Sequence, residues 1–476
     1  MDKDIQRVVM HEAIQYLLDR FEQIEAKRRT TTGARRIGVE LKFPLVDLTG
    51  GAASFSKTKE LWSFLTNDGW EGILDPLTKE IIGVKKSGEM NETFASCETG
   101  FCKIEFSLAH AGDLHQLFSS IHDLLKTLKR FSKEYEVAFL CYGIQPLALP
   151  GKHLLMKKSR NIFWDSLFGG NSIISPEDGT DVHLFTVTAS NQVHVDVNRE
   201  ETVDAINVLN GLAGAQIALT ANSNVWQGRI DPVHKCVGEV FWDWWLKKQD
   251  GRFGVPLRRF HDLEDYIASI LDFPPVYIKR GSEPIGLPHC PSFGAFYSCS
   301  TENRCQEGFR VEGCGLTTDG MPTEVTPENF DLDHHLTFFW HNARLSRYFT
   351  LENRCNDQQP PDGIMAVPAL TLGLMENLNA AVDLINQYPW GVLRESRIQA
   401  ACSGLDAKVE GVPISQLSRG MVEIAEAGLK KRGLKEEIFL APLKERLEEG
   451  YCPADAAAEI FRSEGVEGLV GRLKIK

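Results

Sequence analysis

The sequence lacks the common signatures of phosphate binding and of nucleophilic catalysis. No GxxxxGK[ST] loop occurs in its 476 residues, and GCGLTTDG at 313–320 is too loose to match a dinucleotide fingerprint. No GxSxG nucleophile elbow is present either. These absences argue against a P-loop enzyme and against a Rossmann enzyme.

Long apolar runs are also absent. No window reaches 18 uncharged apolar residues, so we expect no membrane-spanning helix and no membrane partner. The first 29 residues, MDKDIQRVVMHEAIQYLLDRFEQIEAKRR, have the pattern of a charged amphipathic helix rather than of a signal peptide. The pattern predicts a helix over 1–30 and a cytoplasmic protein.

The chain has fewer basic than acidic residues. The chain has 52 Lys and Arg against 65 Asp and Glu, which gives a formal charge of −13. Such a balance disfavours nucleic acid or an anionic membrane as the main partner and favours a small molecule or a protein. The eleven cysteines are an odd number, so we expect reduced thiols rather than a disulfide framework.

The apolar periodicity predicts a mixed fold. Alternation predicts strands at 36–43, 102–108, 136–144, 183–197 and 347–355. Helical spacing predicts helices at 57–67, 112–132, 200–220 and 262–271, and a mainly helical part over 364–476. Because the strands do not alternate regularly with helices, we expect an α+β fold with an antiparallel sheet.

A Gly-, Cys- and Pro-rich stretch over 285–325 interrupts this pattern and predicts a long surface excursion. It holds His289, Cys290, Cys299, Cys305 and Cys314, none of them in a C-x2-C pair. Reduced loop thiols are therefore favoured, and a zinc site is the alternative.

Polar residues recur at alternate positions of four predicted strands. Side chains of a strand alternate between its two faces, so residues of equal parity share a face. The polar faces are Gly38, Glu40 and Lys42; Lys103, Glu105 and Ser107; Ser190, Gln192, His194 and Asp196; and Tyr348, Thr350, Glu352 and Arg354. Each of the four faces carries at least one carboxylate.

Two interpretations of these faces are open. A half-exposed sheet in contact with solvent would explain any one of them. Solvated faces are usually rich in Thr, Lys and Ser, whereas a carboxylate recurs here on every face. Carboxylates gathered on one concave face repel one another unless cations neutralise them, and Mg²⁺ prefers oxygen ligands. The set as a whole favours a metal–nucleotide site.

Several motifs follow one another along the chain in a defined order. GWEGILDPLTKEIIGVKKSGE at 69–89 leads into CETGFCKIEFSLAHAGDLHQ at 97–116. Later motifs are QVHVDV at 192–197, ANS at 221–223, the HLT…RLSRY run at 335–348 and GLKKRG at 428–433. In this order they resemble the plant- and proteobacterial-type glutamate–cysteine ligases, a family whose fold is similar to glutamine synthetase. The resemblance extends from about residue 36 to about 463.

The resemblance implies one catalytic domain over 1–476, with a largely antiparallel sheet that forms a funnel and helices packed outside it. It implies an ATP- and Mg²⁺-dependent ligase that joins an amino-acid carboxylate to an amine through an acyl phosphate. Glutamate and cysteine are the default substrates, and γ-glutamylcysteine is the default product. A monomer or a homodimer is expected, and no covalent enzyme nucleophile is required.

The resemblance also implies roles for individual residues. The metal ligands would be Glu40, Glu98, Glu105 and Glu352. The nucleotide would be bound by Lys85, Gln192 and Arg354, with Arg354 and Glu105 as the catalytic residues. The amino-acid substrates would be bound by His194, Asn222 and Arg229.

This sequence departs from the family pattern at charged positions. The family has a second acid two residues after the first in its E-x-E strand, and here that residue is Lys42. Either one metal ion is lost or the ammonium replaces part of its charge. Two arginines expected to hold the glutamate substrate are missing: Val187 occupies the place of one, and Arg229 is the candidate substitute for the other.

These departures keep other functions open. The same ligase chemistry with a different donor or acceptor, in a specialised pathway, is the first alternative. A non-catalytic descendant that binds nucleotide, or a phosphotransferase of related fold, are the others.

Overall fold

A nine-stranded antiparallel sheet forms the centre of the molecule, in the order β16-β17-β7-β1-β5-β4-β3-β2, with β6 paired to the end of β1. The computed structural model describes residues 3–29, 35–76, 78–88, 92–161, 170–246, 251–281, 283–287, 290–297, 306–310 and 322–476. The strands β2 to β5 are neighbours both in the sheet and in sequence, whereas β7 and β17 lie between β1 and β16. The predicted α+β class with a large antiparallel sheet is confirmed.

The strands of this sheet are short except for the first. Their bounds are β1 Ile37–Asp47, β2 Glu71–Leu74, β3 Ile81–Ser87, β4 Glu92–Cys97, β5 Lys103–Ser107, β6 Val137–Phe139, β7 Asn191–Asp196, β16 Ala343–Leu345 and β17 Thr350–Asn353. Two strands of a separate pair, β10 Phe253–Gly254 and β15 Trp340–His341, run parallel to each other. The remaining two-stranded pairs are β8 Val225–Trp226 with β9 Arg229–Ile230, and β18 Lys408–Val409 with β19 Val412–Pro413.

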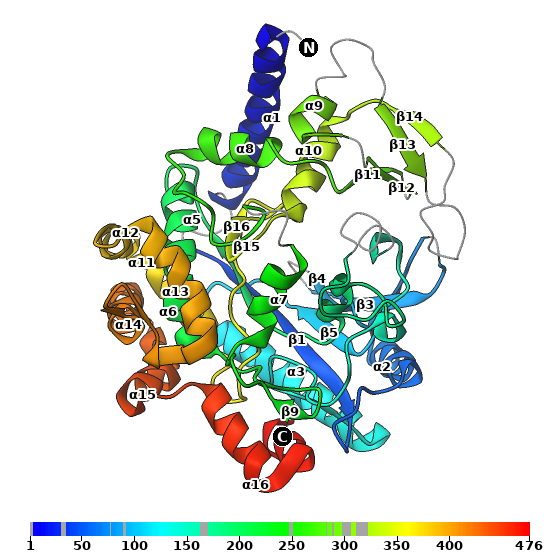
Figure 1. Ribbon diagram of the computed structural model, residues 1–476, viewed down its shortest axis with the longest axis vertical. Coiled ribbons are helices and arrows are strands. Elements are labelled where there is room, and N and C mark those ends of the chain that lie inside the picture. The colour runs from blue at the N-terminus through cyan, green and yellow to red at the C-terminus, as the bar shows by residue number, and fades with distance from the viewer. Residues whose placement is uncertain are drawn as a thin grey trace.

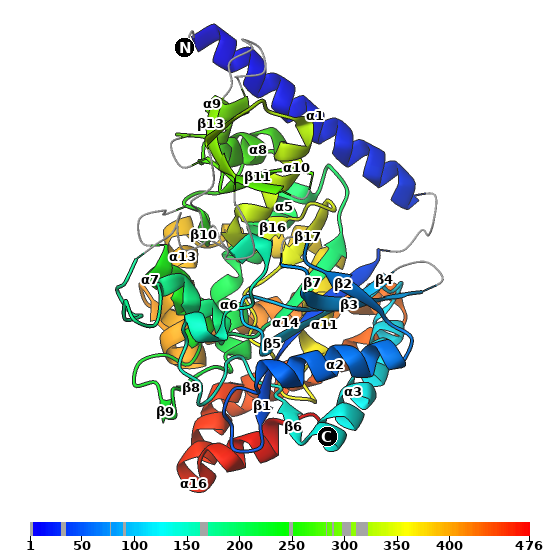
Figure 2. The ribbon, with the colours of Figure 1, turned by 90° about the vertical axis from the view of Figure 1, so that its right-hand side faces the viewer.

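The apolar face of the sheet is buried beneath helices. Val39, Leu41 and Phe43 of β1 are at most 2% exposed and join one core with α2 (Phe55–Asn67) and α3 (Leu114–Tyr135). Figure 2 shows both helices lying along this part of the sheet. Burial of each side chain of this size contributes about 1.5–3 kcal/mol to the free energy of folding. The alternation of apolar residues along β1 therefore decides which face of the strand points to the core. The opposite, polar face is therefore left for the cavity described below.

The C-terminal part consists mainly of helices that pack on one another. Their bounds are α11 Ala366–Glu376, α12 Leu378–Asn386, α13 Trp390–Ser403, α14 Ile414–Arg432, α15 Ala441–Glu449 and α16 Pro453–Leu473, with short 3₁₀ turns at Gly404–Asp406 and Glu436–Leu440. Residues 366–375 of α11 are buried on all sides, because this helix is in contact with α14, β1 and β7. Figure 1 shows α16 at the opposite end of the molecule from α1.

The other end of the molecule is built around α1 (Lys3–Arg29). In both ribbon views α1 lies beside three shorter helices, which contact it: α8 Leu263–Leu271, α9 Phe293–Tyr297 and α10 Asn329–His335. A second sheet pairs β11 Tyr277–Arg280, β12 Glu283–Gly286, β13 Gln306–Arg310 and β14 Pro322–Val325 in this order. Four residues of the possible zinc set fall outside the described residues: His289, Cys299, Cys305 and Cys314. The zinc alternative therefore stays a prediction.

Three expected elements differ from the structure. The strand expected over 183–197 begins as a 3₁₀ helix, Asp181–Thr186, and only β7 is extended. All residues of that 3₁₀ helix are buried, so the alternation of apolar and polar residues there did not separate a buried face from an exposed one. The strand expected over 136–144 is a ladder only along β6, and beyond it Leu140 and Ile144 form single bridges to Lys474 and Thr188. The helix expected over 200–220 is two helices, α5 Thr202–Gly211 and α6 Ala213–Thr220.

The edge strands β2, β3 and β4 were not predicted from alternation. β2 is exposed along most of its length, and β3 carries Lys85 and Lys86, so neither shows an apolar face of period two. Further helical segments of the described chain are α7 Val237–Trp245 and the 3₁₀ turns Lys152–Leu154, Ser159–Asn161 and Leu336–Phe338.

Candidate active site

A cavity of about 1050 Å³ opens on the polar face of the central sheet. Its size is in the range of a site for a cofactor-sized ligand. The register explains its lining, because directly paired residues of antiparallel strands point to the same side. Glu40 pairs with Ser107 and with Gln192, Lys42 pairs with Glu105, and His194 pairs with Glu352. The four polar faces predicted from parity thus converge on this one cavity.

Lys42 lies at the centre of the acidic cluster. Its Nζ is 3.2 Å from Glu40 Oε2 and 3.1 Å from Glu105 Oε2, and it donates to Gln192 Oε1 at 2.8 Å. Burial opposes its charge, but the Glu105 and Glu40 carboxylates raise the pKa of Lys42 above its ordinary value. The ammonium is therefore a permanent counter-ion built into β1.

Glu352 is held by two arginines. Arg344 Nε, from β16, donates to Glu352 Oε2 at 2.8 Å, and Arg354 Nη1 donates to Glu352 Oε1. Arg354 also reaches Gln192 Oε1 at 3.4 Å. Burial would raise the pKa of Glu352, but the two guanidinium groups bring it well below the ordinary value. Glu352 is thus an ionised carboxylate at the cavity wall.

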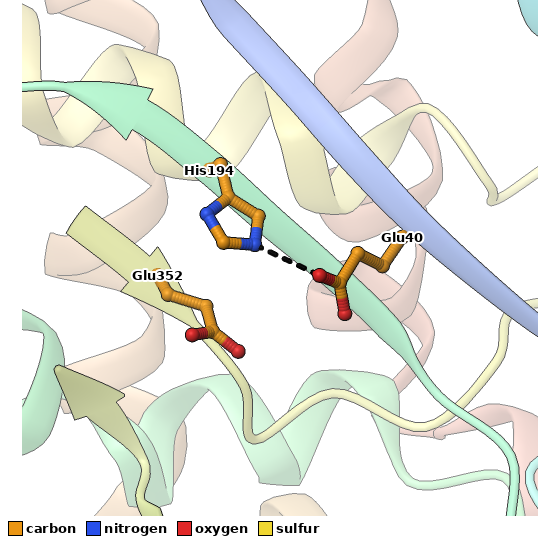
Figure 3. A group of neighbouring side chains, drawn as sticks. All are labelled: Glu40, His194 and Glu352. Carbon is orange, nitrogen blue, oxygen red and sulfur yellow. Dashed lines mark hydrogen bonds and ion pairs between the residues drawn. The ribbon is translucent and has the colours of Figure 1, made fainter. Parts of the chain in front are cut away.

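Glu40, His194 and Glu352 together form a group with the spacing of metal ligands. One donor atom from each lies within 4.8 Å of the others. His194 Nε2 is 3.1 Å from Glu40 Oε1, and its Nδ1 is 2.9 Å from the Thr350 hydroxyl. Figure 3 shows the imidazole from β7 and the two carboxylates, from β1 and β17, directed toward a shared space. His194, expected to bind substrate, therefore lies among the expected metal ligands.

Protonation differs between the carboxylates of the cluster. Burial acts to raise the pKa of Glu40, but Lys42 and the hydrogen bond with His194 lower it to about 2. Burial raises the pKa of Glu105 to about 7, with Lys42 pulling it down and Glu40 and Glu98 pushing it up. A side-chain hydrogen bond joins Glu105 to Glu98, which also lines the cavity. Near neutral pH the Glu105 carboxyl is thus partly protonated.

The charges of the cluster nearly balance. Four carboxylates, Glu40, Glu98, Glu105 and Glu352, face three fixed cations, Lys42, Arg344 and Arg354. Buried charges are tolerated only when they are paired and hydrogen-bonded, which this arrangement achieves without any bound ion. The carboxylates exceed the fixed cations by one, and either a proton on Glu105 or an added cation would complete the balance.

Three expected site residues lie away from the cluster. Lys85 points to the cavity side of the sheet, but it sits on the exposed strand β3 and pairs with Glu92 at 2.9 Å, so it belongs to the rim. Arg229 is exposed in the β8–β9 hairpin and does not line the cavity. Asn222 does not line it either, because its side chain is buried and donates to the Cys141 and Gln358 carbonyls. The expectation of substrate contacts from Arg229 and Asn222 is not supported by these positions.

Sequence reasoning did not identify several residues of the cavity. Arg344 is part of the RLSRY motif, and its pairing with Glu352 across β16 and β17 gives it the role of a counter-ion. Asp357 and Glu239 line a deeper wall of the cavity. An aromatic wall includes Trp242 and Trp340, whose rings stack at 5.7 Å. Two of these residues had a signal in the sequence: Arg344 belongs to the RLSRY motif, and Trp242 belongs to the aromatic run VFWDWW at 240–245, which is typical of a core or a pocket wall.

Comparisons with known proteins agree with this geometry. The family model described as Glutamate-cysteine ligase family 2 matches residues 36–472. The chloroplastic glutamate–cysteine ligase of Arabidopsis thaliana is 26% identical over 407 residues, covering 83% of this chain and 70% of that protein. The chloroplastic enzyme of Solanum lycopersicum is 25% identical over 452 residues, covering 87% and 79%.

A solved structure supports the fold. Glutamate–cysteine ligase from Francisella tularensis in complex with AMP has a TM-score of 0.52, covering 92% of this chain and 87% of that chain at 9% identity. At this identity the likeness shows the fold alone. Because the family model spans most of the chain, from the first strand of the cavity to the last helix, the chain belongs to glutamate–cysteine ligase family 2 and is an ATP-dependent carbon–nitrogen ligase.

Proposed function

We propose that the protein joins glutamate to cysteine in an ATP- and Mg²⁺-dependent reaction that yields γ-glutamylcysteine. The observation that carries this proposal is the acidic cluster itself, in which four strands bring carboxylates and fixed cations to one cavity. Both phosphoryl transfer to a carboxylate and release of phosphate place negative charge next to negative charge, so cations at the reacting centre are the main requirement.

The residues present fit one divalent cation. Glu40, His194 and Glu352 would hold it, because two carboxylates and an imidazole present their donor atoms within 4.8 Å of one another. When bound, the ion would neutralise charge on the nucleotide phosphates. A second ion does not fit between Glu40 and Glu105, since the Lys42 ammonium already lies about 3 Å from both. We therefore propose that Lys42 replaces a metal ion.

The protein groups would act by position and charge. The donor carboxylate attacks the γ-phosphorus of ATP, ADP leaves, and an acyl phosphate forms. The amine then attacks the acyl carbon, phosphate leaves, and the amine loses a proton. Arg354, aligned by Glu352 and Gln192, would stabilise the transferring phosphoryl group through its planar guanidinium. Lys42 would stabilise the same phosphoryl group from the other side, and the Glu105 and Glu98 carboxylates would hold the Lys42 ammonium in position.

A second candidate keeps the chemistry and changes the amino acid. Val187 is buried at the place where an arginine was expected, and Arg229 is exposed and does not line the cavity. The glutamate α-carboxylate would then need another cation, for which Arg347 of the cavity lining is the candidate. This difference favours testing donors other than glutamate alongside it.

The remaining expectations concern the surroundings of the reaction. We propose that Lys85 meets the nucleotide at the rim and that the partners are amino acids, with a monomer or homodimer as the assembly. No helix among the described residues is both long and apolar enough to cross a membrane. The cytoplasmic location expected from the sequence stays a prediction without support from the relatives, whose names place them in the chloroplast.

The test is ADP release by the purified protein with Mg²⁺-ATP and a panel of donors and acceptors that includes glutamate and cysteine. Mass spectrometry of the product identifies the amide. ADP release that requires both amino acids, with γ-glutamylcysteine as product, supports the proposal. An amide from another pair supports the second candidate, and absence of ADP and amide with every pair contradicts both. A phosphorylated product without an amide would indicate a phosphotransferase instead.

A further inference from the structure

Asp357 is a buried carboxylate at the deep wall of the cavity. Its residue is 5% exposed, and it lines the cavity together with Cys236, Gly238 and Asn356. It forms a bridge with Ser190, whose carbonyl accepts from the Lys42 backbone N–H at 2.9 Å. Neighbouring strands are about 4.8 Å apart, so Asp357 lies roughly two strand spacings, about 10 Å, from Lys42. An amino-acid-sized molecule spans such a distance.

The contacts of Asp357 come from neutral groups. Its Oδ2 accepts from the Asn222 backbone N–H and from the Ser223 hydroxyl, both at 2.7 Å, and the Cys236 thiol also donates to the carboxylate. Across the described part of the chain, no lysine, arginine or histidine forms an ion pair with it. A buried carboxylate without a cation is costly, and proteins seldom keep one without a use.

The neighbouring carboxylate, Glu239, shows the contrast. It lines the same wall but is paired with Arg397 Nε at 2.6 Å and accepts from Asn342 Nδ2 at 2.6 Å. Its charge is compensated inside the protein. Among the described residues no cation compensates the charge of Asp357, although Asp357 and Glu239 line the same cavity.

The backbone leaves room on the cavity side of Asp357. Gly238 lines the cavity, and a Cβ added there would lie 3.4 Å from Asp357 Oδ1. The absence of a side chain at Gly238 thus leaves space on the cavity side of this oxygen. Gly143 is also packed against Asp357, where a Cβ would lie 2.6 Å from its Cγ and 2.7 Å from its Oδ1, so the backbone at Gly143 limits where the carboxylate can move.

We propose that Asp357 binds the ammonium group of an amino-acid substrate. The inference rests on the proposed function and adds to it the subsite for the positive end of the substrate. An ammonium group supplies the missing cation and up to three N–H donors, which suits a carboxylate whose contacts are all with neutral donors. Burial raises the pKa of Asp357 to about 6, so the group remains an anion at neutral pH. The donor and the acceptor both carry an ammonium group, and the experiment separates them.

The experiment compares amino acids with analogues that lack the amine. Calorimetry with an ATP analogue and Mg²⁺ would measure binding of glutamate against glutarate and of cysteine against 3-mercaptopropionate. Wild type and Asp357→Asn are compared, because the amide oxygen can still accept from Asn222 and Ser223. We expect the variant to lose roughly 10- to 100-fold in affinity for one amino acid and little for its deaminated analogue. The pair that shows this difference identifies the donor or the acceptor as the ligand.

A matched control is Asp196→Asn. Asp196 lines the same cavity, but Arg36 Nε binds it at 2.9 Å, so its substitution should leave the ratio of amino acid to analogue unchanged. Equal losses for amino acid and analogue in Asp357→Asn, or no loss in either pair, overturn the inference while the ligase activity of the wild type stands. A wild type that binds neither amino acid and releases no ADP with the panel overturns the proposed function and this subsite with it.

Discussion

The two sides of the acidic cluster are neutralised in different ways. On the Glu105 side the counter-ion is part of the chain, because Lys42 reaches Glu105 and Glu40 at about 3 Å. On the His194 side Glu40 and Glu352 face a shared space with an imidazole between them, which is open to an added cation. The difference teaches that one sheet face can carry a permanent cation beside a group of side chains with the spacing of metal ligands. A single change, Lys42 at the second acidic position of the E-x-E pattern, is enough to produce this difference.

The largest effect is expected at the residue shared by both sides. Glu40→Gln removes one proposed metal ligand and one partner of Lys42, so ADP release should fall by about 10³-fold. Calorimetric titration should show loss of Mg²⁺ binding in the same variant. The Asp196→Asn variant is the control for loss of a cavity carboxylate. Unchanged Mg²⁺ affinity in Glu40→Gln would show that the metal site lies elsewhere.

The next effect tests the built-in cation. Lys42→Met leaves Glu40 and Glu105 without their shared partner, and breaking such a buried pair costs about 3–5 kcal/mol of unfolding free energy. Chemical denaturation in metal-free buffer measures the loss, and added Mg²⁺ should restore part of it. Lys42→Glu should bind one more divalent ion per chain than the wild type. A thermal stability that does not respond to Mg²⁺ in either variant would contradict a shared cation position.

A smaller effect concerns Asp357 and has a pH signature. The pKa of Asp357 is raised from its ordinary value of 3.8 to about 6, mainly by burial, with Glu239 adding to the rise and the Asn222, Ser223 and Cys236 donors opposing it. The folded protein therefore loses stability from this group as pH rises from about 4 through 6. Asp357→Asn removes that loss, so the ligand-free variant should gain at most about 3 kcal/mol at pH 7.5. Denaturation at pH 4 and pH 7.5 checks the sign, and a gain at pH 4 alone would contradict it.

The smallest effect is expected at the rim. Lys85 is exposed and already paired with Glu92, so Lys85→Met should change the KM for ATP by no more than about threefold and leave the melting temperature unchanged. Steady-state kinetics measures the change. A loss comparable to that of Glu40→Gln would place the nucleotide much closer to β3 than the cluster suggests.

The polar faces could be predicted because they depend on a local rule. In β1, β5, β7 and β17 a period of two separates Glu40, Glu105, His194 and Glu352 from buried apolar neighbours, and the register brings them together as expected. The rule could not predict that Lys85 lies at the rim of the cavity. Parity gives the face of the sheet to which a side chain points, but not the distance of the strand from the centre of the sheet. Nor did it identify Asp357, which follows the end of β17 and is held by Ser223 from 134 residues away.

The sequence by itself determined the class of fold, the side of each strand that faces the cavity and, through its ordered motifs, the family. These properties follow from patterns that neighbouring residues carry. Only the tertiary structure decided that Lys42 lies between two carboxylates, that Arg344 compensates Glu352, and that no lysine, arginine or histidine among the described residues pairs with Asp357. Such pairings join residues far apart in the chain, and the energy of a buried charge depends on all the groups that surround it in space.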